Sequence, residues 1–174
     1  MTRARLGLPL ALLVLAAGGP AAAQASTATV DLRASLISAL TLTAESPLSF
    51  GTIIPLQFET ATVTVSPAGL VTSSSAVTGP GRETPAPGPF RVTGQANAFF
   101  QIALPTAGTI VSGNASMRLS DFVQAVEGGE AGPNLGQLDA SGRRTFYVGA
   151  TLTVNPDQPA GEYVGTYPVT VRYQ

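Results

Sequence analysis

The side chains that most often do chemistry in proteins are sparse in this chain of 174 residues. It has no histidine and no cysteine, and all nine of its basic side chains are arginines. A serine nucleophile would therefore lack the histidine or lysine that usually acts as its base. The same absences remove the commonest zinc ligands and the disulfides that many small exported proteins use. We therefore expect a protein that is not an enzyme, with no catalytic residues, no cofactor and no metal.

Carboxylates are the remaining candidates for a reactive or metal-binding site. A carboxylate pair for glycoside hydrolysis would be Asp121 with Glu127, or Glu127 with Glu130. Oxygen ligands for calcium would come from Asp121, Glu127, Glu130, Asn134 and Asp139, but their spacing matches no calcium-loop motif. Several of these residues lie in a glycine-rich stretch. We interpret the acidic residues as groups that keep this loop solvated.

The first 25 residues have the parts of a secretory signal peptide. Arg3 and Arg5 supply a positive start, and residues 6–17 form an apolar segment that is too short to span a membrane. Residues 23–25, Ala-Gln-Ala, fit the small-residue pattern of a cleavage site, and cleavage after Ala23 fits nearly as well. We expect an exported protein of the periplasm, the cell surface or an extracellular fibre.

Cleavage would leave an extension or first strand, residues 26–36, followed by one domain, residues 37–174, with no membrane span. Seven arginines then stand against ten acidic residues, so the net charge is 7 − 10 = −3. Sparse, scattered basic charge argues against nucleic acid or an anionic membrane as a partner. Charged residues make up only 11% of the chain. Such a weakly charged surface is more typical of a subunit that packs against others than of a free monomer.

Short segments rich in Val, Thr, Leu, Phe and Tyr, separated by Gly and Pro, are typical of an all-β sandwich. No segment after residue 25 has a convincing helical pattern. The expected strands are residues 29–36, 40–44, one starting at 48–51, 60–65, 70–77 at an edge, 90–93, 98–104, 109–111, 117–126, 144–154 and 161–174. Residues 79–89 and 127–136 are expected to be loops. We predict an immunoglobulin-like β-sandwich with antiparallel sheets.

The last fourteen residues carry the clearest pattern. Tyr163, Tyr167, Val169, Val171 and Tyr173 fall on one parity, while polar residues occupy most of the other. Side chains in a strand alternate between faces, so this segment is predicted to be a half-buried strand that pairs with another strand.

Two features modify this final strand. Gly161 ends a Pro-Ala-Gly corner, which the Tyr163 hydroxyl is expected to close with a hydrogen bond to the backbone. Pro168 removes one ladder donor, so we expect one edge there to be open, bulged or differently paired.

Residues 28–36 are the leading candidate for the partner strand. Val30, Leu32, Ala34 and Leu36 lie on one parity of this segment. Burial of its three larger apolar side chains would contribute about 5–9 kcal/mol, at ~1.5–3 kcal/mol each, before entropy is subtracted. The segment would pair either within its own domain, as a first strand, or within a neighbouring molecule.

The ending resembles that of chaperone–usher pilins, which have alternating apolar residues, a penultimate aromatic and a glycine fourteen residues from the end. Tyr173 and Gly161 occupy the last two of these positions. Residues 38–174 also resemble a family of secreted bacterial domains of undefined role that is distantly similar to common-pilus fimbrillins. The matching stretches are residues 40–43, 48–51, 90–94, 138–140 and 148–154, together with the ending. The resemblance to pilins implies a sandwich lacking one strand, which a chaperone and then the extension of a neighbouring subunit supplies.

Two functions follow as expectations. The first is a structural subunit of a surface polymer, such as a pilus or fimbria, assembled by β-strand addition with neighbouring subunits, a periplasmic chaperone and an usher as partners. The alternative is a monomeric immunoglobulin-like module for binding or adhesion in the periplasm or at the cell surface. The missing disulfide and Pro168 depart from the pilin pattern.

Overall fold

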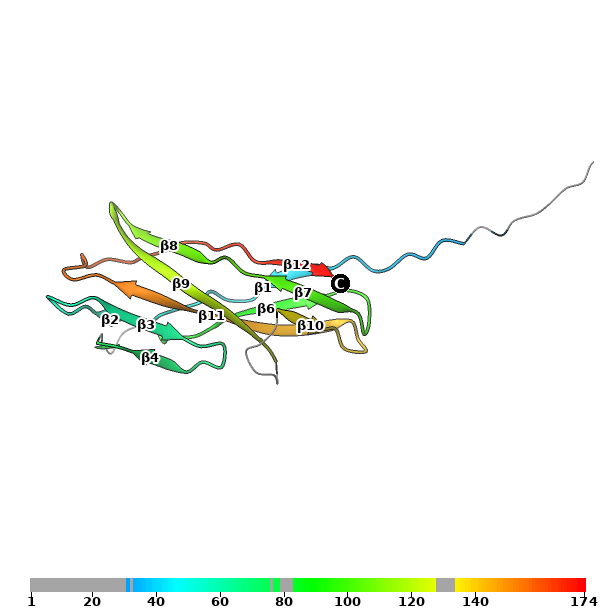
Figure 1. Ribbon diagram of the computed structural model, residues 1–174, viewed down its shortest axis with the longest axis horizontal. Helices are drawn as coiled ribbons and strands as arrows, with labels where there is room; N and C mark the ends of the chain where they lie inside the picture. The colour runs from blue at the N-terminus through cyan, green and yellow to red at the C-terminus, as the bar shows by residue number, and fades with distance from the viewer. Residues whose placement is uncertain (1–30, 32, 76, 79–82, 128–133) are drawn as a thin grey trace, which may run out of the picture. The chain divides into compact units, whose positions relative to one another are not determined.

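The computed structural model describes residues 31, 33–75, 77–78, 83–127 and 134–174. The chain divides into two compact units, residues 1–35 and 36–174, and the fold described below is that of the second unit. This unit contains two antiparallel sheets of seven and three strands, consistent with a sandwich, and a further pair of short strands (Figure 1). Within the described ranges, no helix is long and apolar enough to cross a membrane.

The twelve strands are short except for two long ones near the middle of the large sheet. They are β1 Thr41–Ala44, β2 Ile53–Ile54, β3 Ala61–Val65, β4 Val71–Ser73, β5 Val77–Thr78, β6 Gly88–Thr93, β7 Phe99–Ala103, β8 Ala107–Ser112, β9 Ala115–Val126, β10 Leu135–Gln137, β11 Arg143–Val154 and β12 Thr170–Tyr173. The large sheet contains β1, β3, β4, β6, β8, β9 and β11, and the small sheet has the order β10-β7-β12.

Strand β11 organises the large sheet. It pairs with β9 along one side, and on the other side with β6 and then β3. Val65 of β3 lies opposite Ala150, and Gly88 of β6 lies opposite Val148, so β3 and β6 follow one another along the same edge of β11. They amount to one strand interrupted by an insertion, residues 66–87.

Gly149 lies where this insertion leaves the sheet. A Cβ atom at this position would collide with the carbonyl oxygen of Val65, so the departing chain requires glycine here. The insertion then turns back: β4 pairs with β3 at the sheet edge, β5 pairs with β2, and Ala86 forms a bridge with Ser49. The insertion therefore holds the segment that precedes β3.

The core consists of two apolar clusters, and only one of them lies between two sheets. The closed cluster combines residues of the large sheet with residues of the small sheet and the loop after it: Phe90, Val92, Phe146 and Val148 with Phe100, Ile102 and Leu138. The buried members of the open cluster all come from the large sheet: Ala61, Val63, Met117, Leu119, Leu152 and Val154. No strand of the small sheet, among the residues described, covers this second cluster.

Most of the expected strands are confirmed, with shifted ends. Four expectations are corrected. The strand expected to start at 48–51 is only an isolated bridge at Ser49, and the expected strand 70–77 is divided into β4 and β5, which belong to different sheets. β6 begins at Gly88, inside an expected loop, and β10 overlaps the end of the expected loop 127–136. The expected strand 161–174 is a ladder only over Thr170–Tyr173, with a single bridge at Val164. Pro168, which has no N–H to donate, lies two residues before this ladder. The expected strand 29–36 is not formed at any of its described residues, 31 and 33–36.

Candidate functional site

A groove of about 710 Å³ lies over the open cluster. Its floor is the inward face of the large sheet, formed by Ile110 of β8, Met117 and Leu119 of β9, and Leu152 and Val154 of β11. Residues 47–53 form one wall, and residues 158–167 form the other. The groove is therefore apolar at its base and bounded on both sides by irregular backbone.

The first wall presents free backbone groups to the groove. Ser49 exchanges two backbone hydrogen bonds with Ala86, both of 2.9 Å. In an antiparallel pair of this kind, the N–H and C=O groups of the adjacent residues point to the opposite side. Those adjacent residues are Leu48 and Phe50, and neither forms a backbone–backbone hydrogen bond within the described part of the chain. Their polar groups therefore face the groove.

The second wall has the same arrangement. Val164 exchanges hydrogen bonds of 2.9 and 3.0 Å with Val111 of β8. The backbone groups of Tyr163 and Gly165 consequently point away from β8, toward the groove. Neither residue forms a backbone–backbone hydrogen bond with another residue that the structure describes. The two walls are thus two strand-like edges separated by an apolar floor.

Tyr163 fixes the corner that opens the second wall. Its hydroxyl donates to the carbonyl of Pro159 at 2.8 Å and accepts from Nε2 of Gln158 at 2.9 Å. The hydrogen bond predicted from the corner sequence is therefore confirmed.

We expect Tyr163→Phe to lower the free energy of unfolding by about 1–2 kcal/mol, because it removes the partner of two hydrogen bonds. Urea unfolding followed by circular dichroism measures this change. Tyr147→Phe is the matched control, since no described contact involves the Tyr147 hydroxyl, and it should change the free energy by less than about 0.5 kcal/mol. Equal effects of the two substitutions would contradict this role of the corner.

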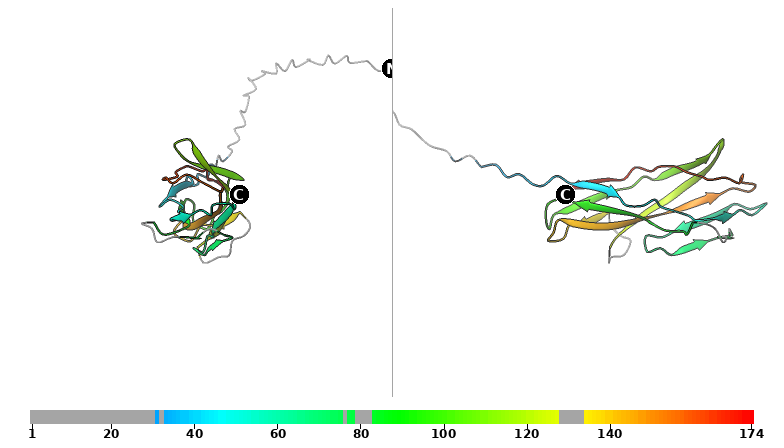
Figure 2. Two further views of the ribbon diagram at one scale, coloured as in Figure 1. Left: turned by 90° about the vertical axis from the view of Figure 1, so that its left-hand side faces the viewer. Right: turned by 180° about the vertical axis from the view of Figure 1, so that it is seen from behind.

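The Tyr173 hydroxyl forms two hydrogen bonds to the backbone of distant segments. It donates to the carbonyl of Ser38 at 2.7 Å and accepts from the backbone N–H of Gln95 at 2.7 Å. This contact ties β12 to the segment that leads into β1, and Figures 1 and 2 show β1 beside the C-terminal strand from opposite sides. Tyr163 and Tyr173 therefore anchor the two ends of the final segment, residues 163–173.

Tyr167 lies between these ends and joins the two clusters. Its ring centre is 6.1 Å from that of Phe90 and 5.2 Å from that of Phe122. Burial raises the pKa of the Tyr167 phenol to about 12 from its ordinary 10.0. Folding therefore favours the neutral form of the Tyr167 hydroxyl.

A pH dependence follows from this shift. Because the folded pKa exceeds the unfolded one, the contribution to stability is complete below about pH 10 and is lost as the pH rises toward 12. We expect the free energy of unfolding to fall more steeply across this interval for the natural chain than for Tyr167→Phe. Urea unfolding at several pH values, with tyrosinate absorbance recorded in parallel, measures both quantities. Identical slopes would contradict the prediction.

The alternating pattern predicted for the ending is present. Tyr163, Tyr167, Val169, Val171 and Tyr173 are half-buried, whereas the residues between them are exposed. Gly161 lines the groove beside Ser112.

The residues predicted for the extension are described only in part. Ala34 and Leu36 are exposed and belong to no strand, with Leu36 92% exposed. Val30 and Leu32 lie outside the described residues. The partner of this segment stays a prediction.

Residues 40–173 match the family described as Domain of unknown function (DUF4402). The chain belongs to this family. No curated protein and no solved structure matched it. Since the description of the DUF4402 family states no activity, the geometry of the groove carries the functional argument.

The acidic residues of the DUF4402 domain have local roles. Oδ1 of Asp139 accepts hydrogen bonds from the Oγ and N–H of Ser141 and from the N–H of Arg143, and these bonds lower the pKa of the Asp139 carboxyl. Asp121 occupies a β-bulge with a positive φ of 50°. Glu130 lies outside the described residues, and elsewhere no three acidic side chains gather into a metal-binding group.

Sequence reasoning missed the first wall and the floor of the groove. The motif at residues 48–51 signals a strand, but nothing in it shows that Ser49 pairs with Ala86 across the insertion. The sequence predicts strands at residues 117–126 and 144–154, but no local pattern distinguishes a buried position with a second sheet above it from one without.

Proposed function

We propose that this DUF4402 domain is an incomplete immunoglobulin-like sandwich and a structural subunit of a bacterial surface polymer, such as a pilus or fimbria, assembled by β-strand addition. The observation that carries the proposal is the pair of backbone edges that face one another across an apolar floor. Leu48 and Phe50 offer one edge, and Tyr163 and Gly165 offer the other.

A β-strand is the ligand that such a site fits best. Backbone N–H and C=O groups near an apolar surface need hydrogen-bond partners, and a strand placed between two edges supplies them on both of its sides. Its inward side chains would pack against the partly buried side chains that border the floor, such as Phe50, Ile53 and Tyr163. One inserted segment would thus satisfy the polar walls and the apolar floor together.

The proposed occupant is the segment 28–36 of a neighbouring subunit. Nine extended residues span about 30 Å, which is longer than the seven residues 161–167 that border the groove. Val30, Leu32, Ala34 and Leu36 would point to the floor, while the polar side chains between them would face solvent. Before assembly, a strand of a periplasmic chaperone would occupy the same place, as the resemblance to chaperone–usher pilins implies.

The size of the groove favours a second candidate, a monomeric module that binds a ligand in the periplasm or at the cell surface. A volume of about 710 Å³ lies within the range of about 300–1,000 Å³ found for small-molecule sites. Glu83 and the rim residue Glu162 would add polar contacts to an apolar ligand. This reading leaves residues 26–36 without a role.

The two functions are distinguished by the behaviour of residues 26–174 and of the same chain without residues 26–36. We expect the longer form to polymerise and the shorter form to be monomeric. A peptide of residues 28–36 should bind the shorter form and, at a concentration of one hundred times Kd, raise its free energy of unfolding by about 2.7 kcal/mol. A peptide with the same composition but interrupted alternation is the control.

Sedimentation velocity and thermal unfolding supply the measurements. If residues 26–174 form a stable monomer that unfolds cooperatively without any partner, the polymer proposal is wrong and the binding module takes its place.

A further inference from the structure

The floor of the groove is already covered in the empty domain. Met117, Leu119 and Leu152 are only 8%, 5% and 1% exposed, although no described strand of the small sheet lies above them. Side chains of the two walls, among them Phe50 and Tyr163, pack over this floor instead. The side chains of an occupant can therefore reach the floor only if the walls move apart.

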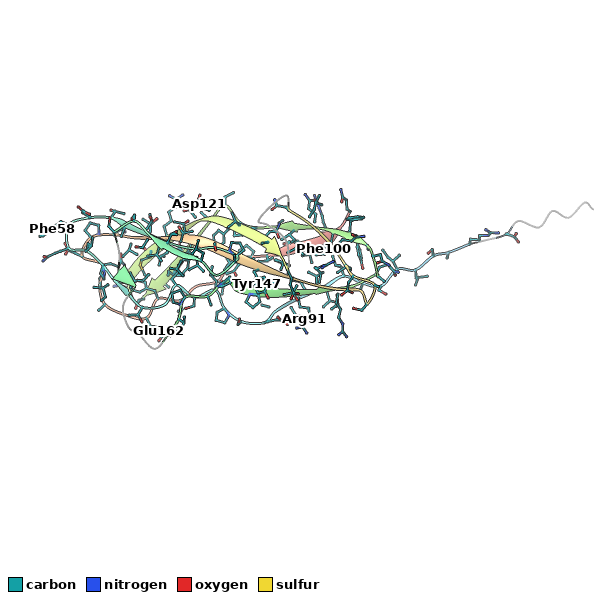
Figure 3. The ribbon with its side chains drawn as sticks, turned by 90° about the horizontal axis from the view of Figure 1, so that it is seen from below. Phe58, Arg91, Phe100, Asp121, Tyr147 and Glu162 are labelled. Atoms are coloured by element: carbon teal, nitrogen blue, oxygen red, sulfur yellow. The ribbon has the colours of Figure 1, made fainter. Side chains whose placement is uncertain are left out.

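The second wall continues into a stretch that the backbone holds only at its two ends. The chain forms a bridge at Val164 and joins a ladder again only from Thr170 onward. Between these points, residues 165–169 form no backbone–backbone hydrogen bond with the described residues. Figure 3 shows Phe100 of β7, the strand beside β12, and Glu162 toward opposite ends of the domain, so this stretch crosses the middle. Side chains must therefore hold it in place.

Two tyrosines of the final segment reach across the interior to glycines at the two ends of β6. The hydroxyl of Tyr167 lies at Gly88, because a Cβ atom on this glycine would be 2.7 Å from the tyrosine oxygen. The hydroxyl of Tyr173 lies in the same way at Gly94, directly after β6. The two tyrosines and the two glycines are each six residues apart, so the final segment and β6 run in the same direction. Each contact depends on the missing Cβ atom of its glycine.

The two contacts are held differently. The Tyr173 hydroxyl forms two hydrogen bonds, whereas the Tyr167 hydroxyl forms none with a described residue. Tyr167 is held by its ring, which lies near two phenylalanines, and by the fit of its hydroxyl at Gly88. Leu48 of the first wall lies beside the same glycine, since its backbone N would be 3.3 Å from the added Cβ atom. Tyr167 therefore connects the second wall to the first.

We propose that Tyr167 is a latch that sets the distance between the two walls. While its hydroxyl is seated at Gly88, the walls cover the floor; when the hydroxyl leaves Gly88, residues 165–169 move outward and admit an occupant. The latch rests on the proposed function in taking a strand as the occupant, and it adds control of access to strand addition. Tyr167 acts in it as a positioning residue, through the walls.

The contact at Gly88 can be broken and repaired by substitution. Gly88→Ala should release the latch, because the added Cβ atom takes the place of the Tyr167 hydroxyl. Tyr167→Phe in the same chain removes that hydroxyl and should restore the fit. The matched control is Gly94→Ala, which produces the same kind of clash with Tyr173, a residue that does not line the groove. If Gly88→Ala does not fold, Tyr167→Ala releases the latch without adding an atom.

Two spin labels report the distance between the walls. Thr52 and Thr166 are exposed on opposite walls, and the chain has no cysteine, so nitroxides attach only at Thr52→Cys and Thr166→Cys. The chain without residues 26–36 serves for the measurement, because the groove and both tyrosine contacts lie within residues 37–174. Pulsed electron paramagnetic resonance gives the distance between the labels.

We expect a longer distance in Gly88→Ala than in the natural chain before any peptide is added, by up to about 5 Å, the spacing of one strand. The natural distance should return when Tyr167→Phe is added and should persist in Gly94→Ala. The peptide of residues 28–36 should bind Gly88→Ala more tightly than the natural chain, by about fivefold or more, because the walls no longer have to be unlatched.

An unchanged distance in Gly88→Ala, or a longer one that Tyr167→Phe does not reverse, would overturn the latch and leave strand addition intact. An equal change in Gly94→Ala would also overturn it, and a longer distance with unchanged peptide affinity would overturn its control of access. If the distances change as expected but the peptide binds none of the chains, the latch between the walls is supported and strand addition fails.

Discussion

Replacement of Phe146 by alanine is expected to lower the free energy of unfolding by about 3–5 kcal/mol, a large part of the stability of a domain of this size. Phe146 is fully buried in β11 and stacks on Phe90 with a ring-centre distance of 5.3 Å. The substitution removes a large apolar surface and leaves a cavity that the surrounding strands cannot fill. Urea unfolding of the chain without residues 26–36 measures the loss in the absence of polymer.

Phe99→Ala provides the matched control, because Phe99 is the same residue type but 54% exposed on the outer face of β7. Its replacement should cost less than about 1 kcal/mol. If Phe146→Ala and Phe99→Ala destabilise the domain equally, the closed cluster is not what holds the fold together.

The closed cluster matters because the other half of the large sheet lacks a second layer. Phe146 and Val148 are covered by Phe100 and Ile102 of the small sheet. In the open cluster, no strand of the small sheet lies above Leu152, within the residues described. Under the proposed function, a domain built in this way would fold on the closed cluster, and an inserted strand would pack against the other half. Substitutions in the two halves should therefore respond differently to added peptide.

The sequence predicts those parts of the site that depend on local pattern. Alternation over residues 163–173 indicated which side chains are buried, because burial in a strand follows parity. The corner bond of Tyr163 was predictable for a similar reason, since its acceptor, the Pro159 carbonyl, lies only four residues away. Pro168 likewise marked the place where the final ladder could not continue.

Contacts between distant segments were not predictable from the sequence. β3 and β6 form one interrupted strand only because both pair with β11, and the length of the insertion conceals this relation. The first wall depends on Ser49 meeting Ala86, a contact across 37 residues. No periodicity in the sequence encodes such pairings, because they depend on the order of the strands in the sheet.

The extension, residues 26–36, is a second case in which the sequence does not predict the pairing partner. Its alternation predicts a strand with one apolar face, but alternation does not predict which sheet such a strand would join. Leu36 is exposed in the single chain, and a tyrosine hydroxyl holds Ser38, only two residues further on. The chain is thus anchored at Ser38, while Leu36, two residues before it, belongs to no strand.

Leu32→Asp is expected to abolish assembly while leaving the domain folded. The substitution removes the burial of a leucine, worth about 1.5–3 kcal/mol, and adds the cost of placing an unpaired carboxylate over an apolar floor. A combined loss of about 4 kcal/mol or more would weaken strand binding roughly a thousandfold. Ser35→Asp introduces the same charge on the opposite parity, where the side chain would face solvent, so it should alter binding by less than about fivefold.

Sedimentation of both variants over a range of concentrations, with competition by the peptide of residues 28–36, measures the difference. Equal loss of assembly in the two variants would show that charge alone, rather than the apolar face of the strand, decides binding.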